Sequence, residues 1–197
     1  GIVPLPNAST VYDVPLTLEA HSVAQFVATK LGLKDNKPQL DDWKKLVATI
    51  KDDTKSEVKI GVVAKYMHHE DTYTSVFEAA KAAAWAEGLR AKLVWIDAEK
   101  ITAQNVKEQI GDVDGIIVPG GFGSRGVEGK IMAADYAIKN DLPYLGLCLG
   151  MQVAVIAQLR EALGGGASVN STEINEKAKH PVIALMDEQA HVVTMGG

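Results

Sequence analysis

Cys148 is the residue whose setting most clearly predicts chemistry in this 197-residue sequence. It is the only cysteine, and Gly146 and Gly150 lie two positions away on either side. An apolar run at 142–147 precedes it, and an apolar helical pattern at 151–163 follows. This arrangement is typical of a sharp strand-to-helix turn with a strained nucleophile at its apex. The start of a helix also favours the thiolate, which is the reactive form of cysteine.

A second glycine-rich loop, 119–126, holds four glycines in eight positions. Its peptide N–H groups, together with the N–H of Leu149, are suited to hold an oxygen that becomes negatively charged during a reaction. A flexible surface turn and a phosphate cradle are alternatives, although the loop lacks the Lys-Ser/Thr ending of a P-loop. For Cys148 the alternative is a small buried hydrophobic residue, which is the commoner role of a lone cysteine.

The elements expected to position these loops alternate between strand and helix from residue 58 onward. Alternation of this kind predicts an α/β fold with an open, mainly parallel sheet flanked by helices. Such sheets bind ligands at the carboxyl ends of their strands, so both loops should share one rim. The predicted strands are 58–64, 91–96, 114–118 and 142–147, and the predicted helices are 71–88, 101–110, 127–139 and 151–163.

A helical segment is expected in front of this domain. Residues 1–16 form a proline-containing lead-in, and apolar spacing predicts a helix from Thr17 that Gly32 ends. A polar linker at 34–38 leads to a second amphipathic stretch at 40–50. The charged connection that follows, 51–57, predicts a domain boundary.

Composition excludes several classes of function. A hydrophobic content of 47% allows a sizeable core, and a net charge of −5 argues against binding nucleic acid. No apolar run approaches the roughly 20 residues that a membrane span needs. One cysteine excludes an internal disulfide and, with no recognisable signal peptide, favours a cytoplasmic location. We therefore expect neither a nucleic-acid nor a membrane partner.

The sequence His68-His69-Glu70-Asp71 is the one stretch that suggests a metal site. Adjacent histidines point in different directions, and no third ligand follows at a suitable spacing. We interpret the stretch as a solvated loop and predict no metal site.

The two glycine-rich loops, taken in order, resemble those of the class I (triad) glutamine amidotransferases. The chain also contains the motifs Val11–Leu16, Gly123–Lys130, Asn170–Glu173, His180–Val182 and Met195–Gly197. Together with the loop motifs Pro119–Gly123 and Gly146–Gln152, they resemble the CTP synthase family more narrowly. The resemblance implies a flavodoxin-like fold in which 1–35 are the end of a synthetase domain, 36–57 a linker and 58–197 an amidotransferase domain that is incomplete at its C-terminus.

The resemblance also implies a mechanism. Cys148 would attack the side-chain amide of L-glutamine, with the oxyanion held by the N–H groups of Gly121 and Leu149. Glu173 would face the substrate's α-amino group, and Arg125 would lie in a lid linked to activation by GTP. The released ammonia would aminate UTP to CTP, with ATP and Mg²⁺, in the synthetase domain. The implied glutamine-binding set is Gly121, Leu149, Gly150, Met151, Gln152 and Glu173.

The sequence also departs from the family. The triad of the family has a His and a Glu beyond the Met-Gly-Gly motif, whereas this sequence ends at Gly197 and none of its five histidines matches. We therefore expect little glutaminase activity from the chain alone and no cofactor within it. The full-length enzyme is expected to be a homotetramer assembled through its synthetase domain. Another class I amidotransferase and a non-catalytic fragment that keeps only the fold are alternatives, but residues 1–57 argue against the first.

Overall fold

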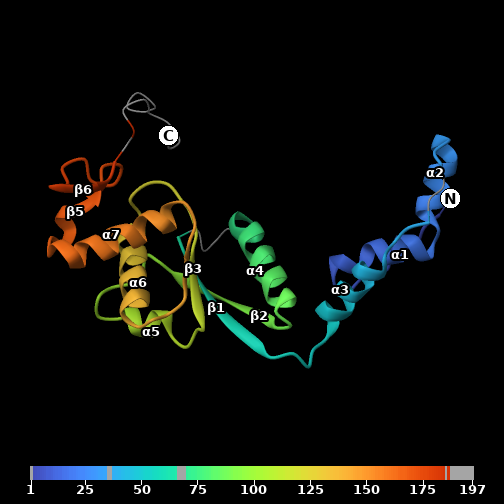
Figure 1. Cartoon of the computed structure of the whole chain (residues 1–197), viewed down its shortest axis with the longest axis horizontal. Helices are drawn as coiled ribbons and strands as arrows, with labels where there is room; N and C mark the ends of the chain where they lie inside the picture. Colours follow the sequence, from blue (N-terminus) through green and yellow to red (C-terminus); the bar gives the residue numbers. More distant parts are fainter. Residues whose placement is uncertain (1, 35–36, 66–69, 185, 187–197) are drawn as a thin grey trace. The chain divides into compact units, whose positions relative to one another are not determined.

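The computed structural model describes most of the chain (Figure 1). The described residues are 2–34, 37–65, 70–184 and 186.

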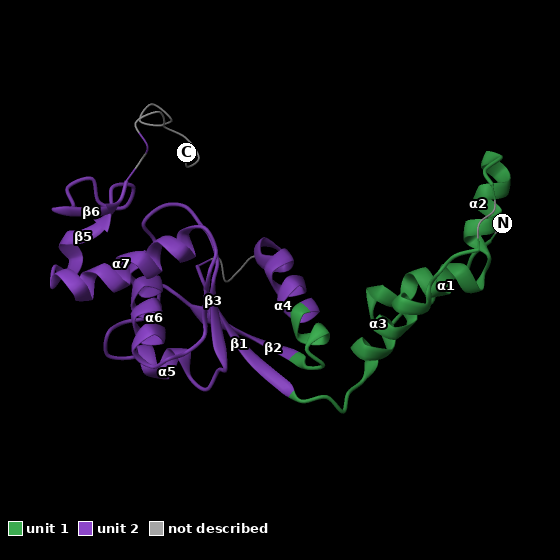
Figure 2. Ribbon diagram, viewed as in Figure 1, with its two compact units in different colours: residues 1–56, 83–90 green, residues 57–82, 91–197 purple. Residues whose placement is uncertain are grey.

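The chain divides into two compact units (Figure 2). The first comprises Gly1–Ser56 together with Ala83–Arg90, and the second comprises Glu57–Ala82 together with Ala91–Gly197. Most of the division falls at Ser56, within the charged connection that predicts a boundary. The assignment of the N-terminal residues to a synthetase domain and a linker stays a prediction.

Helices make up the first unit, and the first predicted helix is wrong in its bounds. It begins at Val14 rather than Thr17, because Pro15 suits the first turn of a helix. It is then interrupted at Ser22, whose φ of 54° is left-handed. Gly32, at φ 64°, ends the second helix as predicted. The helices are α1 (Val14–Ala20), α2 (Val23–Leu31) and α3 (Asp41–Lys51), with a 3-10 turn, η1 (Val11–Asp13), in front.

An aromatic cluster holds the first unit together. The ring of Tyr12 lies 5.9 Å from that of Trp43 and 5.3 Å from that of Trp85, centroid to centroid. The indole Nε1–H of Trp43 also donates to the carbonyl oxygen of Tyr12 at 2.8 Å. Trp85 is therefore a packing residue.

A four-stranded sheet in the order β2-β1-β3-β4 forms the centre of the second unit. β1 pairs with β3, and β3 with β4, in parallel. The register sets Val118, the last residue of β3, opposite Gly146, the last residue of β4. The predicted α/β fold with a mainly parallel sheet is confirmed. The strands are β1 (Glu57–Ala64), β2 (Arg90–Asp97), β3 (Gly115–Val118) and β4 (Tyr144–Gly146).

Helices cover both faces of this sheet, with α4 on one side and α5 and α6 on the other (Figure 1). Successive side chains of a strand point to opposite faces, and β1 shows this plainly. Val63 belongs to the main core with α6 and α7, whereas Val62 and Ala64 pack with Tyr73 and Phe77 on the other face. The helices are α4 (Thr74–Ala86), α5 (Val106–Ile110), α6 (Val127–Lys139) and α7 (Leu149–Leu163).

Two parts of the second unit differ from the predicted pattern. α5 begins at Val106 rather than at residue 101, because the side chains of Thr102 and Asn105 bond to each other's backbone N–H groups and favour a turn. A second sheet of two short parallel strands, β5 (Val169–Ser171) and β6 (His180–Ile183), was not predicted. Within the described ranges, no helix is both long and apolar enough to cross a membrane.

Candidate active site

Cys148 stands at the junction of β4 and α7, where it is exposed and caps the helix. Its φ of 53° and ψ of −111° lie outside the regions that side-chain-bearing residues favour. The N–H of Leu147 donates to the carbonyl oxygen of Val118 at 3.0 Å, and that of Gly150 donates to the carbonyl of Leu147 at 2.9 Å. The predicted strained apex at Cys148 is therefore confirmed.

The flanking glycines are needed because the turn is packed too closely for side chains. A Cβ on Gly146 would lie 2.6 Å from the backbone of Gly150, and a Cβ on Gly150 would lie 1.8 Å from the carbonyl oxygen of Val118. Behind the turn, the hydroxyl of Tyr144 donates to the carbonyl oxygen of Gly150 at 2.6 Å. Burial raises the pKa of this hydroxyl, so it stays a donor at neutral pH. The close packing and the hydrogen bond from Tyr144 therefore hold the turn at Cys148 in place.

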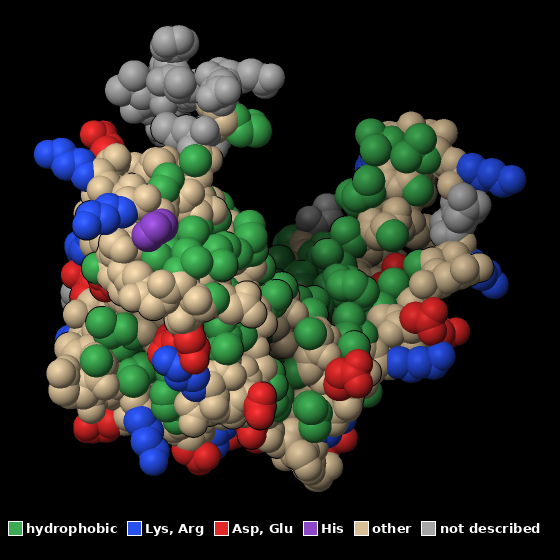
Figure 3. All heavy atoms as spheres, turned by 60° about the vertical axis from the view of Figure 1, so that its left-hand side comes forward, with side chains coloured by type: hydrophobic (Ala, Val, Ile, Leu, Met, Phe, Trp, Pro, Cys, Tyr) green, Lys and Arg blue, Asp and Glu red, His purple; other side chains and the backbone are tan. Residues whose placement is uncertain are grey.

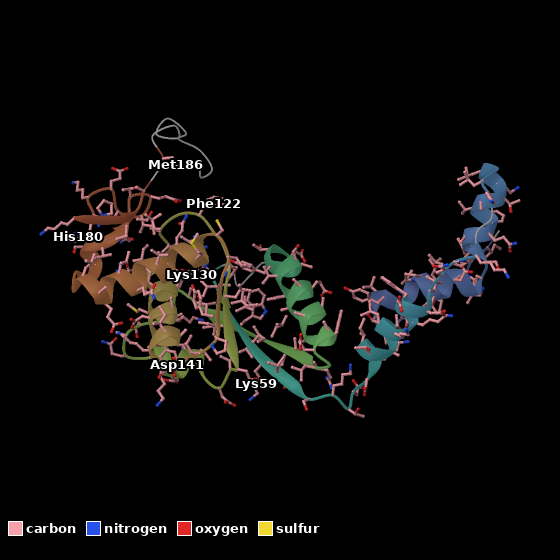
Figure 4. The ribbon with its side chains drawn as sticks, viewed as in Figure 1. Lys59, Phe122, Lys130, Asp141, His180 and Met186 are labelled. Carbon is pink, nitrogen blue, oxygen red and sulfur yellow. The ribbon has the colours of Figure 1, made fainter. Side chains whose placement is uncertain are left out.

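The second glycine-rich loop lies directly beside the cysteine. A Cβ built on Gly120 would be 3.3 Å from the Cβ of Cys148 and 3.8 Å from its Sγ. The two loops therefore share one rim of the sheet, as predicted. Phe122, on the same loop, is 60% exposed and stands away from the core (Figure 4).

Two buried lysines lie under this loop, and sequence reasoning missed both. The ammonium of Lys130 donates to the carbonyl oxygen of Pro119 at 2.7 Å and lies 3.4 Å from that of Gly120. The ammonium of Lys65 donates to the carbonyl of Phe122 and lies 3.3 Å from that of Gly123. Four carbonyl oxygens of the loop therefore face these two cations.

A signal for Lys130 was present in the pattern of α6. The buried face of this helix includes Val127, Ile131 and Ala134, and Lys130 lies on the same face at helical spacing. It is fully buried. A lysine within an apolar stripe is unusual, because burial disfavours the ammonium unless hydrogen bonds compensate for the lost water.

Burial lowers the pKa of Lys130 to about 8, and the nearby charge of Lys65 acts in the same direction. The charge of Cys148 opposes this shift, so the thiol lies within electrostatic range of the Lys130 ammonium. Burial lowers the pKa of Lys65, and the positive charge of Arg125 lowers it further. The negative charges of Glu173 and Glu99 oppose that shift.

Glu173 approaches the loop from the second, smaller sheet. It follows β5 in a turn in which its N–H donates to the hydroxyl of the buried Ser171 at 3.2 Å. Its side chain is exposed, and its carboxylate acts electrostatically on Lys65. The structure therefore brings Glu173 toward the rim that holds Cys148, although its binding role stays a prediction.

Apart from Gly121 on the 119–126 loop, the remaining predicted binding residues lie on the first turn of α7. Leu149 and Gly150 are buried, Gln152 is half-buried and Met151 is exposed. The N–H of Leu149 is the first of the helix, so no earlier turn supplies it with a carbonyl partner. It is thus available to a ligand beside Cys148. The N–H groups of Met151 and Gln152 instead donate to the carbonyl of Cys148 at 3.0 and 3.2 Å.

Arg125, predicted to lie in a lid, forms an ion pair with Glu99 at 3.2 Å. In the sequence, Glu99 has no feature that distinguishes it from an ordinary surface charge. Its pairing depends on the loop after β2 lying beside the glycine-rich loop, which only the tertiary structure shows.

The predictions about histidines and metals fall partly outside the described residues. His68 and His69 lie there, as does the Met195–Gly197 motif. Among the residues that are described, no group of three or more His, Cys, Asp or Glu could hold a metal. His180 is exposed at the start of β6 and lies away from Lys130 and Phe122 (Figure 4).

On the face shown in Figure 3, acidic and basic side chains lie interspersed.

The geometry places an exposed cysteine at the start of a helix and beside a glycine-rich loop. Enzymes that cleave acyl compounds with a nucleophile and backbone donors use such an arrangement. The model of the family "Glutamine amidotransferase class-I" matches residues 68–195, which is most of the chain. The chain therefore belongs to the class I glutamine amidotransferases.

Individual relatives show more specifically which proteins the chain resembles. The chain is 44% identical over its full length to a CTP synthase of Roseiflexus sp. (strain RS-1) and to one of Chloroflexus aggregans. It spans only 35% and 36% of the length of these relatives. A solved structure of the glutaminase domain of Trypanosoma brucei CTP synthase, with bound acivicin, matches 67% of this chain and 51% of its own. That match has a TM-score of 0.61 and 40% sequence identity.

Proposed function

We propose that this chain is the glutaminase part of a CTP synthase. One observation carries the proposal. An exposed, strained Cys148 caps α7 beside Gly120, in a chain of the amidotransferase family that resembles CTP synthases over its full length.

In the proposed reaction, the thiolate of Cys148 attacks the side-chain amide carbon of L-glutamine. The N–H groups of Gly121 and Leu149 stabilise the oxyanion, and each such donor is worth about 3–4 kcal/mol. The carbon–nitrogen bond then breaks, and the nitrogen leaves as ammonia after it takes up a proton from a general acid, which the resemblance implies is the His of the family's triad. A thioester remains. Water cleaves the thioester and releases glutamate. Met151, Gln152 and Glu173 would bind the substrate, as the resemblance implies.

The wider activity belongs to a longer protein in this proposal. The ammonia would aminate UTP to CTP in a synthetase domain that uses ATP and Mg²⁺, with GTP as an activator acting through the lid at Arg125. Residues 1–35 would be the end of that domain and 36–57 the linker. We also propose that the longer protein is a homotetramer in the cytoplasm and that it takes part in pyrimidine biosynthesis. The support is the identity to CTP synthases over all 197 residues.

Covalent labelling tests the glutaminase proposal. Acivicin is an amino acid with an electrophilic carbon, and it is bound in the T. brucei glutaminase domain. We expect it to modify Cys148 with saturation kinetics, and we expect L-glutamine to protect the cysteine. Mass spectrometry of peptides locates the adduct. Labelling no faster than that of free cysteine would contradict a glutamine pocket and favour a chain that keeps only the fold.

A matched pair of variants tests the substrate contact. Glu173→Ala removes the carboxylate predicted to face the α-amino group, so we expect its half-saturating acivicin concentration to rise at least tenfold. The maximal labelling rate should change little, because Cys148 and its donors are untouched. Glu176→Ala removes an exposed carboxylate from the same connection between β5 and β6 and should leave both values unchanged. Equal effects of the two variants would remove Glu173 from the site.

A further inference from the structure

We propose that Lys130 is a positioning residue that orients the oxyanion-binding N–H of Gly121 by holding the carbonyl of the preceding residue. The inference rests on the proposed function, since it concerns the same site. It adds a residue whose side chain acts through the backbone.

The argument begins with the peptide that joins Gly120 to Gly121. In a planar trans peptide, the carbonyl oxygen and the following N–H point in opposite directions. The described residues contain no cis peptide. Fixing the direction of the Gly120 carbonyl therefore fixes the direction of the Gly121 N–H.

Lys130 is placed to fix that carbonyl. Its ammonium lies 3.4 Å from the Gly120 oxygen and donates to the Pro119 oxygen at 2.7 Å. It is fully buried on α6, so water does not compete for these contacts. Glycine residues would otherwise leave the loop free to rotate its peptides.

The surroundings of the ammonium agree with this role. Cys148 lies within its electrostatic range, and the backbone of Gly120 lies against the cysteine side chain. Lys65 holds the carbonyls of Phe122 and Gly123 in the same way, on the outer half of the loop. Both halves of the loop thus turn carbonyl oxygens toward buried cations, which leaves the N–H of Gly121 directed away from Lys130.

The test compares two electrophiles on the 197-residue chain. The chloromethyl ketone analogue of glutamine presents a carbonyl oxygen to the donors, whereas iodoacetamide reads the reactivity of the thiol without using the glutamine pocket. We expect Lys130→Met, which keeps an unbranched side chain one atom shorter and removes the ammonium, to lower the ratio of the two maximal rates at least tenfold. The half-saturating concentration of the ketone should stay the same.

Lys139→Met is the matched control, because it removes an exposed lysine from the same helix. Its ratio should equal that of the unchanged protein. If the ratio in Lys130→Met stays within twofold of that of the unchanged protein, the inference is overturned. An equal fall in both rates would also overturn it, because it would show that Lys130 acts on the reactivity of the thiol. If the unchanged protein shows no saturable reaction with the ketone, the proposed function itself fails.

A second measurement needs no variant and covers the case in which Lys130→Met does not fold. Carbon-detected NMR follows the carbonyl resonances of Pro119 and Gly120 through the titration of the ammonium. We expect both resonances to shift with a midpoint near pH 8, which is the pKa of Lys130. Lys65 and Cys148 are the neighbouring titratable groups. Carbonyl resonances that do not respond in this range would overturn the contact.

Discussion

Lys130 shows how a single residue can serve a site at a cost to the fold. Removing an ammonium from water is unfavourable, and the carbonyl oxygens of Pro119 and Gly120 compensate only in part, as the lowered pKa indicates. A methionine would fill most of the same space without burying a charge. The choice of lysine is understandable if the geometry of the loop matters more than stability.

This cost predicts a dependence of stability on pH. The pKa of Lys130 is about 8 in the folded chain and 10.5 for a lysine in an unfolded chain, so the unfolded state binds more protons between these values. The free energy of unfolding should therefore rise with pH from about 8 to 10.5, by about 3 kcal/mol in total for this group.

Urea unfolding at pH 7, 8.5 and 10 measures the effect. Other lysines also titrate, so the informative quantity is the difference between the unchanged protein and Lys130→Met. The variant should be more stable at pH 7, and its advantage should shrink as pH rises. A difference that does not vary with pH would show that the ammonium is not destabilised by burial.

At the scale of elements, the junction of β3, β4 and α7 positions Cys148. α7 starts so close to β3 that the backbone of Gly150 lies against the carbonyl of Val118. That contact and the bond from the N–H of Leu147 to the same carbonyl set the direction of the turn that carries Cys148.

Gly150→Ala tests the closeness of this packing. Alanine normally favours a helix over glycine, but here its Cβ would lie 1.8 Å from a carbonyl oxygen. We expect a loss of about 3 kcal/mol or more of unfolding free energy, measured by urea denaturation. Gly164→Ala is the control, since its φ is 59° with open space around it and it should cost about 1 kcal/mol. Similar losses in both variants would contradict the packing argument.

The elements show what could be predicted from sequence. The helix at 127–139 and the strand-to-helix turn at Cys148 were predicted correctly because they combine long apolar periodicity with paired glycines. The strands β5 and β6 were not predicted, because polar residues and Pro181 leave them without the apolar run that marks β3 and β4. The contacts of Lys130 and Glu99 were missed since they join segments that are distant in sequence.

At the scale of the whole molecule, the described core is unevenly distributed. The main hydrophobic cluster lies in the second unit, between the sheet and helices α6 and α7. The first unit depends on the aromatic contacts of Tyr12 and has few buried residues, such as Val47. The two units should therefore respond differently to substitution.

Tyr12→Ala tests this independence. It removes the contacts with Trp43 and Trp85, so we expect the first unit to lose about 2 kcal/mol of stability, seen as an earlier change in tryptophan fluorescence on denaturation. The acivicin reaction of Cys148 should be unaffected. Phe26→Ala removes an aromatic ring that is 49% exposed in the same unit and should change little. A slower reaction of Cys148 in Tyr12→Ala would show that the units are coupled.

The backbone at Cys148 has a consequence for how this chain can evolve. A φ of 53° with a ψ of −111° is a conformation that glycine adopts with less strain than cysteine. Stability alone would thus favour replacing Cys148, while the proposed reaction requires its thiol. A lineage freed from selection for glutamine cleavage should lose this cysteine early and gain stability from the change. The residue at this apex is therefore a marker of whether a related chain is still selected as an enzyme.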